Sequence, residues 1–296
     1  MSEEIYVIGI DGGGTQCRAR LYSTRRGILG AGLSGSANPT RHLDTAIHSI
    51  IEASHRAIEN AGLSQLKLSD IHAGMGIAGI NLAPVYKQMS KWEHPFKSCF
   101  LTTDLHIACL GAHNQPEGAV IIVGTGSSGL VVKPSENILI GGHGFPLGDY
   151  GSGAWIGFEA LRYILRSLDG LADKTVMSEI ILNFIGCKNA LHLAETMLTA
   201  KPVDFAKLAP FVFEAAESQD LAASHIIQQG ADQISALAKE LLSHKPSRLS
   251  MIGGISARLR PWLDKTVSAQ IQPAIYQPDY GAVVFALNQL GLSSKF

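Results

Sequence analysis

A strand–turn–strand pattern that occurs twice in the chain constrains the fold more than any other feature. Residues 5–11 form an apolar run that ends at three glycines, and residues 17–23 then alternate polar and apolar side chains, as a half-buried strand does. Residues 119–124 repeat the apolar run, and a turn of small residues and a second strand follow. Because the pattern is duplicated, it predicts two similar halves rather than two unrelated domains.

Strands and helices alternate along the rest of the chain. Strands are expected at 28–33, 71–78, 99–103, 137–142, 248–253 and 274–277. A first helix is expected to start at Asn38-Pro39 and stop at Gly62, a second to lie between the strands at 71–78 and 99–103, and another to follow Gly254. Further helices are expected at about 105–113, 153–169, 173–185, 189–199, 204–217, 220–244 and 281–291. This alternation predicts an α/β fold with parallel strand pairing, in which each meander adds antiparallel strands at one edge of a sheet.

Length and charge narrow the class of protein. A chain of 296 residues is long for a single core, which favours two domains. The net charge is −1, from 24 Lys and Arg against 25 Asp and Glu, so there is no electrostatic reason to bind nucleic acid or an anionic membrane. An acidic N-terminus that leads directly into a strand is unlike a secretory signal, and a cytoplasmic protein with four free, mostly buried cysteines is expected.

The first small-residue turn, Asp11-Gly12-Gly13-Gly14-Thr15, is a candidate phosphate site. It lies between two strands. This excludes the P-loop and the GxGxxG motif of dinucleotide-binding folds, because both lie between a strand and a helix. Consecutive glycines let the backbone aim several N–H groups at one point, which suits phosphate oxygens. Asp11 can hold Mg²⁺, directly or through water, because a hard cation prefers carboxylate oxygen. The alternative is an ordinary hairpin turn with a capping aspartate.

The second turn, Gly124-Thr125-Gly126-Ser127, repeats the same arrangement in the second half. The hydroxyl groups of Thr125 and Ser127 are candidate donors to phosphate oxygens. Two facing hairpins of this kind could hold a triphosphate from both sides, so the pair is far more specific than either turn alone.

Asp104 ends the run LTTD, at the carboxyl end of a predicted parallel strand. Ligands bind at that end of such sheets, and a carboxylate there can accept a proton from an attacking hydroxyl. Asp104 is therefore the candidate general base. The alternative is that it only caps the helix at 105–113.

Two more glycine-rich turns carry candidate binding residues. Asp149, which follows Gly148, could accept hydrogen bonds from sugar hydroxyls, with a capping acid as the alternative. Gly253 and Gly254 end a strand just before Ser256, and the missing side chains would let an adenine or ribose lie against the backbone. A plain strand-to-helix turn is the alternative for this second segment.

In this order the motifs resemble the superfamily of sugar kinases, Hsp70 and actin. The segments that carry the resemblance are IGIDGGGTQCRARLY, LTTD, IVGTGSSGLV, PLGDYGSGAWIG and MIGGIS. Within that superfamily the chain is similar to the BadF/BadG/BcrA/BcrD ATPase family, in its glucosamine and N-acetylglucosamine kinase branch. The resemblance covers nearly the whole chain. It implies an α/β fold of two ribonuclease H-like domains with an interdomain cleft, namely residues 1–114 plus 279–296, and residues 115–278.

The resemblance also implies a role for each candidate residue. Asp104 matches the catalytic base. The residues matching the contacts to phosphates and Mg²⁺ are Asp11, Gly13, Gly14, Thr15, Gly124, Thr125 and Gly126. The residues matching sugar-binding positions are Asn38, Thr125, Gly148 and Asp149, and those matching the adenosine motif are Gly253, Gly254 and Ser256. ATP and Mg²⁺ are the expected cofactors.

The implied activity is ATP-dependent phosphorylation of the 6-hydroxyl of an amino sugar. Tyr150 replaces an acidic residue of vertebrate-type N-acetylglucosamine kinases, and Ala78 stands where a hydroxyl is expected before Gly79. Both positions lie near the implied sugar pocket, which favours glucosamine over its N-acetyl form. The expected partners are a small amino sugar and a second copy of the chain, with neither nucleic acid nor membrane.

Two other functions are possible for this fold. Reductase activators of the same family hydrolyse ATP and hold an iron–sulfur cluster between subunits through cysteines, but Cys17, Cys99, Cys109 and Cys187 show no spacing suited to a cluster. A non-catalytic sugar sensor is the second alternative, and the intact Asp104 with both turns argues against it.

Overall fold

The computed structural model describes residues 3–40, 42–115, 117–133 and 136–292. It divides into two compact units: unit 1 comprises Met1–Gly118, Val132–Glu136 and Pro273–Phe296, and unit 2 comprises Ala119–Val131 and Asn137–Gln272. Residues 1–2 and 293–296 of the predicted N-terminal domain lie outside the described residues. No helix within the described ranges is long and apolar enough to cross a bilayer.

Unit 1 is built on a five-stranded sheet in the order β3-β2-β1-β4-β5. Its strands are β1 (Tyr6–Gly12), β2 (Cys17–Ser23), β3 (Gly27–Ser34), β4 (Ile71–Ile77) and β5 (Ser98–Thr103). The first three form the predicted antiparallel meander, and β4 and β5 pair in parallel beside β1. Gly12 pairs with Ile77, and Ile77 pairs with Thr103, so three carboxyl strand ends lie at one edge.

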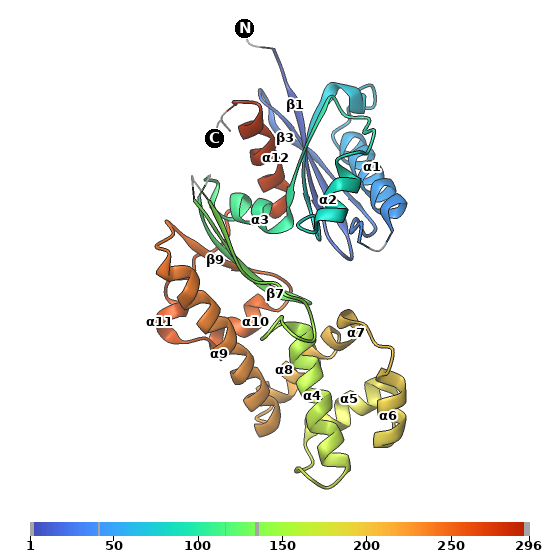
Figure 1. The fold of residues 1–296 in the computed structure, drawn as a ribbon, viewed down its shortest axis with the longest axis vertical. Coiled ribbons are helices and arrows are strands. Elements are labelled where there is room, and N and C mark those ends of the chain that lie inside the picture. Colours follow the sequence, from blue (N-terminus) through green and yellow to red (C-terminus); the bar gives the residue numbers. More distant parts are fainter. Residues whose placement is uncertain (1–2, 41, 116, 134–135, 293–296) are drawn as a thin grey trace. The chain divides into compact units, whose positions relative to one another are not determined.

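Helices cover both faces of this sheet (Figure 1). They are α1 (Leu43–Asn60), α2 (Ala83–Met89), α3 (Asp104–His113) and α12 (Pro278–Gln289), with a short 3-10 turn η1 (Leu68–Asp70). Side chains alternate along β1: Ile8 and Ile10 pack in the core under α1, whereas Val7 packs with α3 and α12. Both faces of β1 are therefore buried, as expected for a strand inside an α/β layer.

Unit 2 contains a four-stranded sheet in the order β8-β7-β6-β9. Its strands are β6 (Gly118–Val123), β7 (Ser127–Val132), β8 (Asn137–Gly141) and β9 (Leu249–Ile252), with β6 and β9 parallel. Its helices are α4 (Gly153–Leu168), α5 (Val176–Ile185), α6 (Ala190–Met197), α7 (Pro202–Ala206), α8 (Ala209–Glu217), α9 (Leu221–Ser243), α10 (Ser256–Leu259) and α11 (Lys265–Ser268), with a 3-10 turn η2 (Arg260–Trp262). A separate hydrophobic core joins α4, α8 and α9 to β6.

Two secondary-structure predictions were wrong. The single helix expected at 204–217 is divided into α7 and α8, because Pro210 lies in the first turn of α8 and has no N–H to continue the preceding helix. The strand expected at 274–277 does not form. Instead, the N–H groups of Ile275 and Tyr276 donate to the carbonyls of Ala112 and Gly111 at the end of α3, at 3.0 Å each.

α12 approaches α3 so closely at Gly281 that only a glycine fits there. We therefore expect Gly281→Ala to destabilise the protein by about 1–3 kcal/mol through overpacking. A Cβ atom at Gly281 would lie 1.8 Å from the carbonyl oxygen of Ile107, which is backbone and cannot swing away. Urea unfolding measures the effect. Gly35→Ala is the matched control, because its Cβ would meet only Ser49 Oγ at 3.5 Å. Equal unfolding midpoints for the two variants would contradict the close approach.

Candidate functional site

The first glycine turn joins β1 to β2 in unit 1, as predicted. The N–H of Gly13 donates to the carbonyl of Gln16 at 3.0 Å and closes the turn, while Gly14 and Thr15 are exposed. The N–H of Ala37 donates to the carbonyl of Gly13, also at 3.0 Å, and so ties the following loop to the turn. The turn thus presents short side chains and backbone at the carboxyl end of β1.

Asp11 lies on β1 just before this turn, half-buried on the face that packs against α3 and α12. Burial raises the pKa of its carboxyl to about 7, with further increases from the negative charges of Asp104 and Asp279. Arg18 opposes this shift; it pairs with Asp11 across β1 and β2. Two carboxylates therefore act on Asp11, one of which, Asp279, is paired with Arg20 at 2.8 Å, and a bound cation would relieve the repulsion on Asp11.

Asp104 is the first residue of α3, but it does not cap the helix. The cap is Thr103, whose side-chain oxygen accepts a hydrogen bond from the N–H of His106 at 3.1 Å. Burial raises the pKa of the Asp104 carboxyl, and hydrogen bonds to its carboxylate from the N–H of Leu105, at 2.9 Å, and from its own backbone N–H oppose that increase. The alternative that Asp104 only caps this helix is therefore wrong. Its carboxylate has capacity for a further hydrogen bond.

The second glycine turn joins β6 to β7 in unit 2. The carbonyls of Gly124 and Thr125 accept hydrogen bonds from the N–H groups of Gly153 and Ala154, at 2.8 and 3.1 Å, which fixes the turn against the start of α4. Thr125 is exposed. Ser127 is buried, and its hydroxyl donates to the carbonyl of Tyr150 at 2.7 Å, so it holds the neighbouring loop.

Asp149 fastens a loop to this turn. Its carboxylate accepts hydrogen bonds from the backbone N–H groups of Ser127, Gly144 and Phe145, which oppose the increase in its pKa that burial causes. A Cβ atom at Gly126 would lie 2.8 Å from a carboxylate oxygen of Asp149. Asp149 does not cap α4, because that role belongs to Ser152, whose side chain accepts from the N–H of Trp155.

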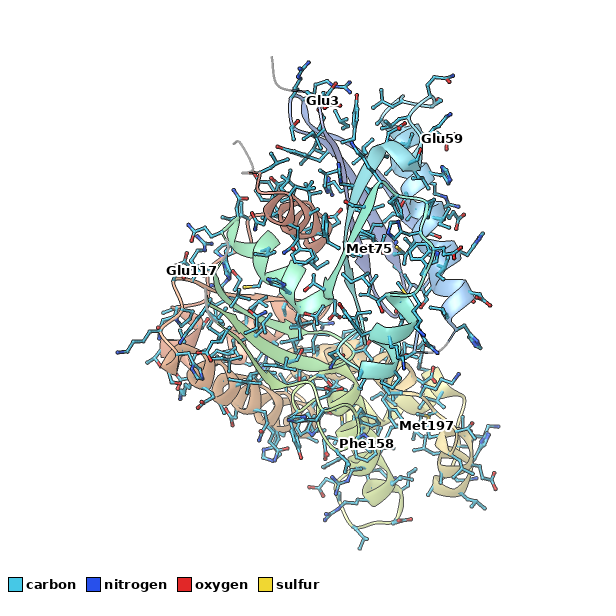
Figure 2. All side chains as sticks on the ribbon, turned by 45° about the horizontal axis from the view of Figure 1, so that its top comes forward. Glu3, Glu59, Met75, Glu117, Phe158 and Met197 are labelled. Atoms are coloured by element: carbon cyan, nitrogen blue, oxygen red, sulfur yellow. The ribbon has the colours of Figure 1, made fainter. Side chains whose placement is uncertain are left out.

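Three aromatic rings anchor the other end of the same loop. Phe145 packs against Phe158 of α4 and Phe205 of α7, with ring centroids 5.3 and 5.1 Å apart. Figure 2 labels Phe158 on α4. The loop is thus held at one end by these rings and at the other by the hydrogen bonds to the Asp149 carboxylate. Asp149 itself adopts a left-handed backbone conformation, with φ 58°. Gly148 lies beside it and is buried.

The turn after β9 packs on the end of β6. A Cβ atom at Gly253, whose φ is 115°, would lie 2.3 Å from the carbonyl oxygen of Val123, so only glycine fits. The hydroxyl of Ser256 donates to the carbonyl of Gly253 at 2.8 Å, and Gly254 has open space where a side chain would be. This turn therefore lies next to the second glycine turn, as parallel pairing of β6 and β9 requires.

The predicted residues fall into two groups, one in each unit. Unit 1 holds Asp11, Gly12, Gly13, Gly14, Thr15, Asn38 and Asp104, and unit 2 holds Gly124, Thr125, Gly126, Ser127, Gly148, Asp149, Gly253, Gly254 and Ser256. Sequence reasoning missed Arg18 and Thr103. Arg18 could have been found from the alternation in 17–23, because residues directly opposite in an antiparallel pair share a face.

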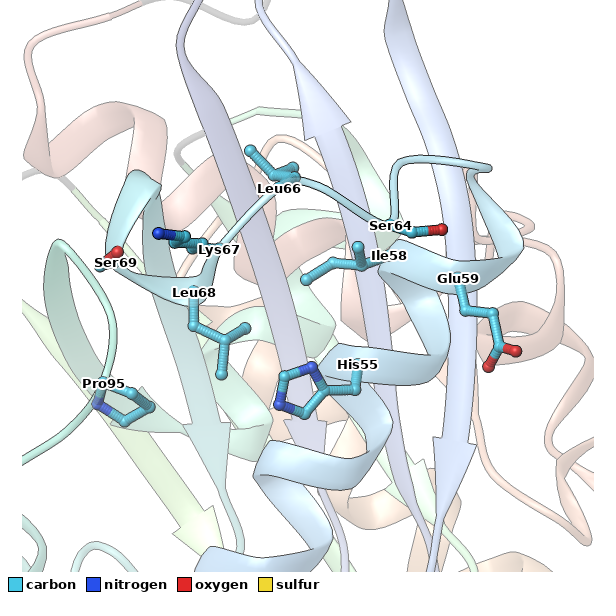
Figure 3. Close-up of a pocket in the computed structure, with 9 residues that line it drawn as sticks. All are labelled: His55, Ile58, Glu59, Ser64, Leu66, Lys67, Leu68, Ser69 and Pro95. Atoms are coloured by element: carbon cyan, nitrogen blue, oxygen red, sulfur yellow. The ribbon is translucent and has the colours of Figure 1, made fainter.

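A surface hollow of about 710 Å³ lies at the other end of the unit 1 sheet (Figure 3). It borders η1, which leads into the amino end of β4, whereas the glycine turn lies at the carboxyl end. Its lining residues are His55, Ile58, Glu59, Ser64, Leu66, Lys67, Leu68, Ser69 and Pro95. None of these lining residues belongs to the candidate site.

Comparison with known proteins gives consistent results. The model of the BadF/BadG/BcrA/BcrD ATPase family matches residues 8–286. A glucosamine kinase of Vibrio cholerae is 33% identical over 281 residues, covering 95% of each chain. The crystal structure of a candidate N-acetylglucosamine kinase from Chromobacterium violaceum has a TM-score of 0.90 and 28% identity, and the match covers 95% of this chain and 99% of that one.

More distant structures identify the fold. A ROK family glucokinase from Streptomyces griseus, solved with glucose and AMPPNP, has a TM-score of 0.52 at 18% identity, and the match covers 96% of this chain and 98% of that one. With the two mixed sheets, this confirms the predicted α/β fold with two ribonuclease H-like units, of the type found in actin and sugar kinases. The interdomain cleft stays a prediction.

Proposed function

This chain belongs to the BadF/BadG/BcrA/BcrD ATPase family, and we propose that it is an ATP-dependent kinase that phosphorylates the 6-hydroxyl of glucosamine. The observation that carries the proposal is the position of Asp104. Its carboxylate lies at the carboxyl edge of the unit 1 sheet, is not required as a helix cap, and interacts electrostatically with Asp11 beside the glycine turn.

Asp104 is the proposed general base. It would orient the sugar hydroxyl and accept its proton as the oxygen attacks the γ-phosphate. Burial raises the pKa of its carboxyl, which makes it a better proton acceptor than an exposed aspartate. Phosphoryl transfer depends mainly on alignment and charge neutralisation, so holding the hydroxyl in line contributes as much as removing its proton.

Asp11 is the proposed Mg²⁺-binding residue, directly or through water. The donor set fits the ion, because a hard cation accepts carboxylate oxygen and Asp11 is a half-buried carboxylate beside the glycine turn. Mg²⁺ is commonly held by one or two carboxylates together with substrate phosphates, where it neutralises their charge. Gly14 and Thr15 would direct backbone N–H groups towards the phosphate oxygens, while Gly12 and Gly13 shape the turn, because the N–H of Gly13 donates to the carbonyl of Gln16.

In unit 2, Gly124, Thr125 and Gly126 form the proposed second phosphate turn. The exposed hydroxyl of Thr125 is the group available to a ligand, whereas Ser127 supports the turn by holding the Tyr150 carbonyl. Gly253, Gly254 and Ser256 are the proposed adenosine-binding turn. Asn38 of unit 1 and Gly148 with Asp149 of unit 2 are the proposed sugar-binding residues.

Glucosamine is the substrate that the observations favour. The curated relative at 33% identity is a glucosamine kinase, whereas the solved structure at 28% identity is that of a candidate N-acetylglucosamine kinase. Tyr150 is exposed next to Asp149 and offers no carboxylate of its own. The reductase-activator alternative fits less well, because Cys17 and Cys109 are fully buried and present no thiol at a surface where a cluster could join two subunits.

The test is ADP release from ATP and Mg²⁺ across glucosamine, N-acetylglucosamine, glucose, N-acetylmannosamine and a blank without sugar. We expect release that depends on glucosamine, with the product identified as the 6-phosphate by NMR. Release that is equal with and without sugar would replace the kinase proposal by that of a partner-activating ATPase. Release that requires only N-acetylglucosamine would keep the kinase and reject the glucosamine preference.

A further inference from the structure

The side-chain amide of Asn38 is held by Thr40. The oxygen Oδ1 of Asn38 accepts two hydrogen bonds, from the backbone N–H of Thr40 at 2.9 Å and from its hydroxyl at 2.6 Å. A backbone N–H can only donate, so the atom facing it must be the amide oxygen and not the amide nitrogen. The orientation of the amide therefore follows from this contact.

The other end of the amide faces the first glycine turn. A Cβ atom at Gly14 would lie 3.9 Å from Nδ2 of Asn38. The loop is tied to that turn through the N–H of Ala37 and the carbonyl of Gly13. Asn38 is half-buried, which leaves Nδ2 beside the turn while Oδ1 is occupied within the loop.

Thr40 also contacts the segment that follows β4. A Cβ atom at Gly79 would lie 2.6 Å from the methyl group of Thr40 and 3.5 Å from Oδ1 of Asn38. The N–H of Ala78, one residue earlier, donates to the carbonyl of Gly12 at 2.9 Å. The loop, the glycine turn and the end of β4 thus meet around Asn38, within unit 1.

We infer that Thr40 is a positioning residue that sets Asn38 to act as a hydrogen-bond donor towards the sugar. This inference rests on the proposed function. With Oδ1 occupied by Thr40, only the NH₂ group of Asn38 is available, so the sugar oxygen that it meets must accept. A sugar hydroxyl in that position then has its own proton free for a carboxylate. Thr40 acts through Asn38 and needs no contact with the sugar.

The variant Thr40→Val tests whether the Thr40 hydroxyl positions Asn38 or whether Thr40 only maintains the shape of the loop. Valine keeps the branched shape and the backbone N–H, which still orients the amide, but it removes the hydroxyl and with it the second of the two hydrogen bonds that hold Oδ1. We expect the KM for the sugar to rise about tenfold, as the loss of one hydrogen bond implies, with kcat and the KM for ATP nearly unchanged. Thr40→Ser restores the hydroxyl and should restore the KM. Thr45→Val, an exposed threonine of α1, is the matched control and should resemble the wild type.

A double-mutant cycle with Asn38→Ala identifies the path of the effect. If Thr40 acts through Asn38, Thr40→Val should change the sugar KM by less than about twofold once the amide is absent. The same tenfold change in both backgrounds would overturn the inference, as would a Thr40→Val enzyme with wild-type KM. A wild-type protein without sugar-dependent turnover would instead reject the proposed function, and the inference with it.

Discussion

Asp104→Asn should lower the turnover number for the sugar by about 10²- to 10⁴-fold, the usual contribution of a positioned general base. Asparagine has nearly the same shape and can still accept from the N–H of Leu105, but it cannot accept the proton of the sugar hydroxyl. Because α3 is capped by Thr103, the helix start should survive the substitution. Nucleotide affinity should therefore stay within about twofold of the wild type, since the substitution adds no bulk.

Two measurements test this expectation together. Coupled ADP release at saturating sugar gives the turnover number, and calorimetric titration gives the affinity for a non-hydrolysable nucleotide. Asp44→Asn is the matched control, because it makes the same chemical change at an exposed position in the first turn of α1. An Asp104→Asn enzyme with turnover near that of Asp44→Asn would remove Asp104 from the reaction.

Asp11→Asn should make the protein more stable and less active at the same time. The charged form of Asp11 is disfavoured by burial and by the nearby carboxylates of Asp104 and Asp279, and its pKa is raised to about 7. Removing that charge should stabilise the metal-free protein by about 1–3 kcal/mol above neutral pH. Phosphoryl transfer should fall sharply, because the amide is a poorer ligand for Mg²⁺ than a carboxylate.

The pH dependence of this gain has a definite sign. A carboxyl group whose pKa rises on folding binds protons more readily in the folded chain, so the folded state is favoured below the unfolded pKa of about 3.9. That contribution is lost as the pH rises through about 7, the pKa in the folded protein. The stabilisation by Asp11→Asn should therefore be large at about pH 8 and small at about pH 5.

Urea unfolding with EDTA, at both pH values, measures the difference between Asp11→Asn and the wild type. EDTA matters because a bound divalent cation would favour the carboxylate and reduce the gain. Adding Mg²⁺ with nucleotide should then reduce the difference in unfolding free energy between the two proteins, because it stabilises the wild type more than the variant. A gain that is the same at both pH values would show that the Asp11 charge is not the cause.

The duplicated turns allowed most of the fold to be predicted, because strand alternation and glycine turns are local signals. Asp104 was harder, since a helix start accepts either Thr103 or Asp104 as its cap on sequence alone. Only the hydrogen bond from His106 to Thr103 decides between them. Sequence likewise could not show that Ser127 faces Tyr150, because that contact joins residues brought together by the loop before α4.

The last helix of the chain determines when unit 1 can finish folding. α12 covers one face of β1 and supplies most of the core that it shares with α3 (Figure 1), whereas unit 2 uses residues 119–131 and 137–272. During synthesis from the N-terminus, domains ordinarily fold in the order in which they emerge. Here the ribosome releases all of unit 2 before α12, so the second unit can bury its core while the sheet of the first still exposes an apolar face. A chain truncated before Pro278 should consequently be a better substrate for chaperones and proteases than the full chain, because it keeps unit 2 but exposes the face of β1 that α12 covers.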